Sequence, residues 1–99
     1  MSEIRIRPRA QSDLIAIWRY SFQQWGERQA DLYLKRLDDG IQSLRDFPDL
    51  GEPCDQIRAS YQKLQVNRHL TFYRRADQRI EVIRVLHQAM DVGRQDRNW

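Results

Sequence analysis

An arginine and a histidine near the end of the chain are the residues best placed for chemistry. Arg68 and His87 bound two runs, 68–75 and 80–87, that are rich in β-branched, aromatic and aliphatic residues and flank the polar break 76–79. This pattern predicts a β-hairpin. A histidine titrates near neutrality and can act as acid or base, and an arginine beside it can hold a phosphate through two hydrogen bonds.

The length of the loop predicts the register of this hairpin. If residues 75 and 80 close the ladder, Arg68 lies opposite His87. The same register pairs Leu70 with Val85 and Phe72 with Ile83 on the same side of the sheet. The other side carries His69, Thr71, Tyr73, Val82, Arg84 and Leu86. A bulge or an odd-length loop would break this pairing.

The first half of the chain predicts a strand and two helices that would support the hairpin. Residues 3–7 alternate apolar and charged types and end at Pro8, as a short strand does. The spacing then becomes helical from about Ala10, and Gly26 suits the end of that helix. Apolar residues recur in this first helix at Leu14, Trp18, Phe22 and Trp25. A second helix, from about Glu27 to Asp46, places a narrow stripe at Ala30, Leu34, Leu37, Ile41 and Leu44.

The remaining segments complete an α+β arrangement. Residues 48–60 contain two prolines and a glycine and predict a connecting loop. The run 61–66 then begins the sheet. The predicted order is β-α-α-β-β-β, with an N-terminal helical hairpin packed on an antiparallel sheet. A length of 99 residues suits one domain, 1–99, with residues 88–99 as a C-terminal tail.

Composition narrows the classes of function. Of the 17 basic residues 15 are arginine, and the excess of positive charge lies in residues 51–99, where an acidic partner or nucleic acid would be attracted. Arginine-biased coding with ordinary surface ion pairs is the competing explanation. The lone Cys54 has no partner for a disulfide and no metal-ligand spacing around it, so we expect neither metal nor cofactor. No membrane span or leader is evident, which favours the cytoplasm.

The first predicted helix is too hydrophobic for a single buried face. Its large apolar residues spread over more than half of a helical wheel, and they are Ile15, Ile17, Trp18, Tyr20, Phe22 and Trp25. A surplus of Trp and Tyr suits protein recognition. The alternative is that a large aromatic residue lies partly exposed without a function, as is common in small domains.

These features together resemble a known family. The element order, the segments 70–73 (LTFY) and 83–87 (IRVLH) and the following Met90-Asp91 are similar to the ParE toxins of bacterial type II toxin–antitoxin modules, within the RelE/ParE superfamily. The likeness extends to the Trp25-Gly26 junction, the 31–34 segment (DLYL), the Gly51 loop with 54–58 (CDQIR), and Tyr61. It covers nearly the whole chain.

The resemblance implies a toxin that poisons DNA gyrase, blocks replication and is neutralised by a ParD-type antitoxin with an acidic segment that folds on binding. DNA would be bound only through the toxin–antitoxin complex. We assign antitoxin contacts to Ile15, Trp18, Tyr20, Phe22, Trp25, Arg74 and Arg84. For the target we assign residues of hot-spot type in the tail, Arg94, Arg97 and Trp99.

Two other classes of function are also compatible with the sequence. RelE-like relatives are ribosome-dependent ribonucleases that cut messenger RNA, and Arg68 with His87 would be the catalytic pair. Tyr73 points to the other side of the sheet and Lys63 alone is a poor substitute for a basic set, so the catalytic set is incomplete. His87 could equally hold a loop carbonyl. A plain nucleic-acid-binding module is the third class, without a recognisable binding motif.

Overall fold

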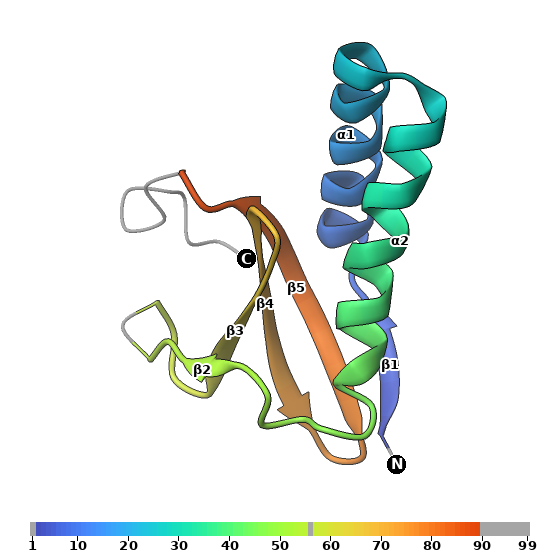
Figure 1. Cartoon of the computed structure of the whole chain (residues 1–99). Helices are drawn as coiled ribbons and strands as arrows, with labels where there is room; N and C mark the ends of the chain where they lie inside the picture. The colour runs from blue at the N-terminus through green and yellow to red at the C-terminus, as the bar shows by residue number, and fades with distance from the viewer. Residues whose placement is uncertain (1, 56, 90–99) are drawn as a thin grey trace.

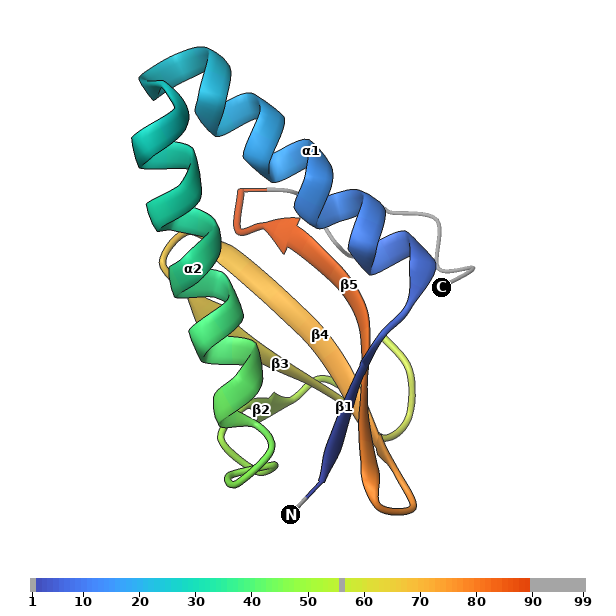
Figure 2. The ribbon, with the colours of Figure 1, turned by 90° about the vertical axis from the view of Figure 1, so that its right-hand side faces the viewer.

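Two helices lie on one side of a five-stranded sheet (Figures 1 and 2). The computed structural model describes residues 2–55 and 57–89. The elements are β1 (Glu3–Ile6), α1 (Pro8–Trp25), α2 (Glu27–Ser43), β2 (Glu52–Pro53), β3 (Tyr61–Val66), β4 (His69–Ala76) and β5 (Arg79–His87). The predicted α+β class is confirmed. The tip of the helical hairpin extends beyond the ends of β4 and β5 (Figure 1).

The sheet is mixed, with the strand order β1-β5-β4-β3-β2. β1 runs parallel to β5, so the prediction of a wholly antiparallel sheet was wrong for this strand. A parallel pair requires a long connection, and here the rest of the fold lies between the two strands in sequence. The prediction also missed β2, a two-residue strand inside the expected loop 48–60 that pairs with β3.

Local sequence signals set the ends of the helices. α1 begins at Pro8, before the predicted start at Ala10, because proline is well tolerated in the first helical turn. Gly26 has a φ of +90° and donates its N–H to the carbonyl oxygen of Phe22 at 2.9 Å, which ends α1. α2 starts at the next residue and stops at Ser43, short of the predicted end at Asp46. Within the described residues, no helix combines the length and the hydropathy needed to cross a membrane.

The two helices bury different fractions of their predicted apolar stripes. α2 packs the predicted stripe into the core, with Leu34 partly buried and Ala30, Leu37, Ile41 and Leu44 fully buried. α1 turns another line of residues inward, namely Ala10, Leu14, Ile17 and Ser21. Phe22 and Trp25 remain 45% and 62% exposed. The surplus of aromatic surface predicted for this helix is therefore present.

A β-bulge changes the register of the β4–β5 hairpin. Next to the turn the pairing is as predicted, up to Tyr73 opposite Val82. Ile83 is then an extra residue on β5, so that Phe72 lies opposite Arg84. From this point the predicted pairs Leu70–Val85, Phe72–Ile83 and Arg68–His87 are wrong. His69, not Arg68, lies opposite His87.

Each face of the sheet has its own buried cluster. Val82 and Val85 pack under α1 and α2, together with Ala10 and Ile41. The opposite face carries the second cluster beneath the loop that precedes β3, formed by Cys54, Tyr61, Phe72, Ile83 and Leu86. Burial raises the pKa of the Cys54 thiol, so this cysteine is a neutral core residue.

Candidate functional site

A large groove lies where the overhanging helical hairpin meets the ends of β4 and β5. Its volume is about 980 Å³. We call it the helix–sheet groove, and it is lined by Asp13, Ala16, Ile17, Tyr20, Ser21, Trp25, Gln29, Tyr33, Arg36, Asn67, Arg68, His69, Arg84, Val85, Leu86 and His87. Apolar side chains from α1 and β5 meet basic and aromatic side chains from α2 and the β3–β4 turn. This combination suits an amphipathic partner.

Two aromatic residues of α1 stand along one wall of the groove. Tyr20 and Trp25 are 59% and 62% exposed, and their rings meet edge to face with centroids 6.1 Å apart. Exposed Tyr and Trp with a fixed mutual orientation offer a large contact area to a partner at a small cost in side-chain entropy.

An ion pair between α1 and β5 forms part of the groove wall. Arg84 donates through Nε to Asp13 Oδ2 at 2.7 Å and through Nη2 to Oδ1 at 3.0 Å. The backbone N–H of Val85 also donates to Asp13 Oδ2, at 3.0 Å. The two side chains are 16% and 15% exposed. The hydrogen bonds to Asp13 raise the pKa of Arg84, so the pair stays charged and fixes the helix to the bulged strand.

Two histidines and a tyrosine form a second polar group at the end of the groove, which we call the histidine cluster. His69 and His87 face each other across the strands with ring centroids 5.2 Å apart. Tyr33 Oη lies 2.6 Å from His69 Nδ1. Burial, with a smaller contribution from the nearby His87, lowers the pKa of His69 to about 4. At neutral pH His69 is therefore uncharged.

The hydrogen-bond partners indicate which ring nitrogens carry hydrogen. The backbone N–H of Ala89 donates to His87 Nδ1 at 3.0 Å, which leaves the hydrogen of the neutral ring on Nε2. Tyr33 Oη accepts the backbone N–H of Arg68 at 3.4 Å and lies 2.6 Å from His69 Nδ1, a contact in which either atom can donate. When the Tyr33 O–H donates, His69 also carries its hydrogen on Nε2, and both rings then present N–H donors.

The residues assigned to antitoxin binding separate into several places. Tyr20, Trp25 and Arg84 line the helix–sheet groove, and Ile15 borders a neighbouring hollow of about 470 Å³ that also includes Tyr20. Trp18 and Phe22 stack on each other with centroids 5.2 Å apart, on a different side of α1. Trp18 is also held by α2, because its Nε1–H donates to Asp31 at 2.8 Å.

Arg74 lies outside the groove in a cluster around Glu81. The carboxylate of Glu81 is 4% exposed and accepts hydrogen bonds from Arg7 at 2.9 Å and from Arg74 at 3.2 Å. Arg79 lies 3.8 Å away. The hydrogen bond from Arg7 is the main reason why the pKa of Glu81 is lowered, and Arg74 adds to it. Arg74 is therefore already paired with Glu81 within the fold.

The predicted catalytic pair is brought into one groove but not into direct opposition. Arg68 lies in the β3–β4 turn and lines the helix–sheet groove together with His87. The carbonyl oxygen of Arg68 accepts the N–H of Gln88 at 2.9 Å, so backbone bonding ties the turn to the end of β5. The predicted target residues Arg94, Arg97 and Trp99 fall outside the described residues.

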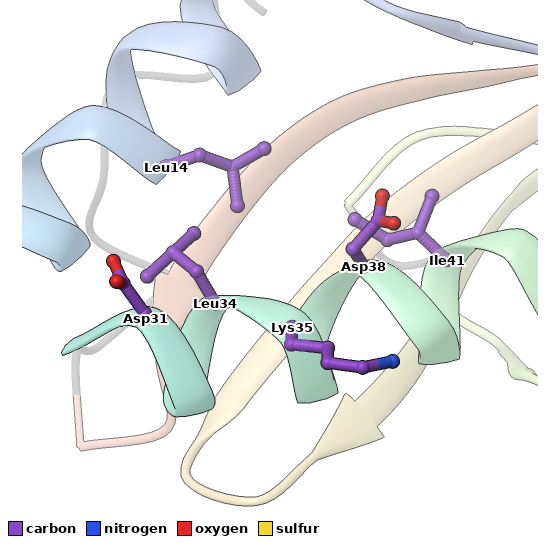
Figure 3. A pocket seen from close by; sticks show the side chains of 6 residues that line it. All are labelled: Leu14, Asp31, Leu34, Lys35, Asp38 and Ile41. Carbon is purple, nitrogen blue, oxygen red and sulfur yellow. The ribbon is translucent and has the colours of Figure 1, made fainter. Parts of the chain in front are cut away.

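A smaller hollow separates the two helices. It has a volume of about 410 Å³, and Leu14 of α1 projects over α2, from which Leu34, Asp31 and Asp38 rise toward it (Figure 3). Its carboxylates, Asp31 and Asp38, are seven residues apart on one helix, a separation of about two turns. Among residues 2–55 and 57–89, no group of three or more side chains could hold a metal ion.

Sequence reasoning did not assign several polar residues of the groove, including Tyr33 and Arg36 of α2, and it placed His69 on the side of the sheet away from His87. The bulge at Ile83 is what brings the two histidines together. Asp13 was also missed, because nothing in the sequence places it beside Arg84.

Comparison with known proteins gives the class of this chain. A sequence profile described as "ParE toxin of type II toxin-antitoxin system, parDE" matches residues 4–92. The fold is similar to that of a chain from the chromosomal ParDE TA system of P. aeruginosa, with a TM-score of 0.78, 16% identity, and coverage of 88% of this chain and 96% of that chain. The class is a toxin of a type II toxin–antitoxin system.

Within that class, the chain belongs to the ParE toxin family. It is 41% identical over 91 residues to Toxin ParE1 of Caulobacter vibrioides, covering 92% of this chain and 94% of that protein. It is 42% identical over 94 residues to Toxin ParE1 of Mycobacterium tuberculosis, covering 94% of this chain and 96% of that protein. The resemblance seen in the sequence is confirmed.

Proposed function

We propose that this ParE-family toxin poisons DNA gyrase, blocks replication and is neutralised by a ParD-type antitoxin that occupies the helix–sheet groove. The observation that carries the antitoxin part is the exposed Tyr20–Trp25 wall beside a groove of about 980 Å³. Apolar surface of this kind marks a protein-binding site. The gyrase part is supported by family membership.

The chemistry of the groove specifies the antitoxin segment. Ala16, Ile17 and Val85 supply apolar surface, and Arg36 and Arg68 add positive charge from two other elements. A helical segment with an apolar face and acidic residues beside it would match both features. Such a segment would order on binding, so part of the interaction energy is offset by its lost conformational entropy.

We infer that the toxin acts by binding and is not an enzyme. Cleavage of RNA through its 2′-hydroxyl needs an unprotonated ring nitrogen to receive a proton. In His87, the histidine of the predicted catalytic pair, Nδ1 accepts the backbone N–H of Ala89, so the neutral form of the ring carries its hydrogen on Nε2. That form offers no free ring nitrogen to the groove as a base. This favours gyrase poisoning over the alternative, a ribosome-dependent mRNA interferase that uses Arg68 and His87.

The rest of the proposal concerns where the toxin works and what else it binds. We infer a cytoplasmic protein formed by one domain, 1–99, without cofactor, metal or membrane partner. DNA is bound only through the complex with the antitoxin. The tail, residues 88–99, carries the target contacts Arg94, Arg97 and Trp99, since Arg and Trp are the residue types that dominate binding energy at interfaces.

Expression in a bacterial host tests the proposal. Induction of the toxin should stop replication and induce the response to double-strand breaks, because a poisoned gyrase leaves cleaved DNA. Co-expression of the ParD-type protein encoded beside the toxin gene should restore growth. Growth arrest with intact DNA synthesis and cleaved messenger RNA would contradict the gyrase proposal and favour the interferase.

A further inference from the structure

We propose that the histidine cluster is a binding subsite for one carboxylate of the antitoxin, held by the Nε2–H groups of His69 and His87. This inference rests on the proposed antitoxin binding in the helix–sheet groove and specifies one contact within it. Tyr33 of α2 contacts His69 of β4, but both histidine rings are only partly buried and both line the groove, so they stay accessible to a partner.

The hydrogen bonds at Nδ1 leave Nε2 as the remaining polar atom of each ring. Ala89 N–H donates to Nδ1 of His87, so Nε2 of that ring carries a hydrogen, and Nε2 of His69 carries one when the Tyr33 O–H donates to its Nδ1. Within the described part of the chain, neither Nε2 has a hydrogen-bond partner. A carboxylate can accept two N–H donors, and the centroids of the two rings lie 5.2 Å apart. This pair would bind a transition metal poorly, because a metal binds an unprotonated imidazole nitrogen and the Nε2 atoms in this arrangement carry hydrogen.

Charge at this end of the groove favours an anion. Asp13 is the single acidic residue among the described lining residues, and its two oxygens are already bound by Arg84 and the Val85 N–H. Arg36 and Arg68 line the same groove and have no acidic partner within residues 2–55 and 57–89. The lining is therefore short of negative charge.

A protein carboxylate fits the groove better than a phosphate of nucleic acid. Phosphates bind along tracks of several cations. Here Arg36, Arg68 and Arg84 share the lining with Ala16, Ile17 and the Tyr20–Trp25 wall, which supply apolar surface. An amphipathic acidic segment uses both parts at once.

An anion seated on this pair changes its protonation. The groups that face the cluster are Asp13 and Tyr20 from α1, Tyr33 and Arg36 from α2, Arg68 from the turn and Arg84 from β5. In the free toxin the pKa of His69 is about 4. A neighbouring carboxylate stabilises the protonated ring and raises this pKa. Binding of the antitoxin should therefore take up a proton at mildly acidic pH, where the free His69 is neutral.

Calorimetry of the full-length toxin with the ParD-type protein encoded beside it tests the subsite. If binding returns the pKa of His69 to its ordinary value near 6.5, affinity should rise about tenfold from pH 7.5 to pH 5.5, with proton uptake visible in buffers of different ionisation enthalpy. His69→Phe should remove this dependence and weaken binding at pH 5.5. Lys35→Gln, which removes a cation of α2 outside the groove, should retain it.

Because a His69 variant could lose stability, the pH dependence of the unmodified toxin is decisive by itself. Binding that is tight but independent of pH would overturn the subsite and leave the proposed function standing. No binding at any pH would overturn both. The inference would also be overturned if the antitoxin showed no pH-linked binding and a single-stranded RNA oligonucleotide did, since the subsite would then bind a phosphate.

Discussion

Replacing Asp13 by alanine should lower the free energy of unfolding by about 3 kcal/mol, because breaking a buried ion pair typically costs 3–5 kcal/mol. Asp13 joins α1 to β5 through two hydrogen bonds from Arg84 and one from the Val85 backbone, at 2.7, 3.0 and 3.0 Å. Alanine leaves a guanidinium and a backbone N–H without this acceptor. The side chains are 16% and 15% exposed, so water replaces the lost bonds only in part, and the value lies at the lower end of the range.

Urea unfolding followed by tryptophan fluorescence measures this loss. With a slope of about 1.5 kcal/mol per M, the midpoint should fall by about 2 M. Asp13→Asn retains an oxygen for the Val85 N–H and should lose about half as much, since it removes the charge but keeps one acceptor. Asp39→Ala is the matched control, because its pair with Lys35 is 62% and 70% exposed and should contribute less than about 0.5 kcal/mol. An Asp13→Ala protein as stable as Asp39→Ala would refute the reasoning.

Three further predictions concern other parts of the molecule. Glu81→Gln should lower the free energy of unfolding by about 2 kcal/mol at pH 7. Folding lowers the pKa of Glu81, so its carboxylate stabilises the fold above the unfolded pKa near 4.5, and this stabilisation is lost as the pH falls through the folded pKa. The difference between variant and unmodified protein in urea unfolding should therefore shrink in acid. Trp25→Ala should weaken antitoxin binding by about tenfold or more while the urea midpoint stays nearly unchanged, because the ring is 62% exposed; equal losses of both would contradict an interface role. Removal of residues 92–99 should lower toxicity in a growth assay more than it lowers thermal stability, and a truncated protein as toxic as the full chain would contradict the assignment of target contacts to the tail.

Hydrophobic periodicity and the positions of glycine and proline predict most of the helices and strands. The junction at Gly26 and the buried stripe of α2 follow directly from helical spacing and from the conformational freedom of glycine. The parallel pairing of β1 could not be predicted, because alternation identifies a strand but not its neighbour. The apolar line predicted for α1 was only partly right: Leu14 packs against the core, but Phe22 and Trp25 stay exposed while the small residues Ala10 and Ser21 are buried.

The candidate site was predicted only in part, and the bulge is the main reason. One unpaired residue, Ile83, moves His69 opposite His87 and displaces Arg68 from that place. Alternation of side chains carries no signal for an extra residue within an apolar run. Ion pairing is equally invisible in composition, so Arg74 and Arg84 were expected to face a partner although Glu81 and Asp13 bind them within the fold.

A supercoiling assay with purified gyrase, relaxed plasmid and ATP tests the central claim most directly. We expect this protein to inhibit supercoiling and to trap a cleaved DNA product, and we expect prior addition of the ParD-type antitoxin to abolish both effects. Full gyrase activity in the presence of excess toxin, together with antitoxin-sensitive cleavage of messenger RNA in a translating extract, would contradict it.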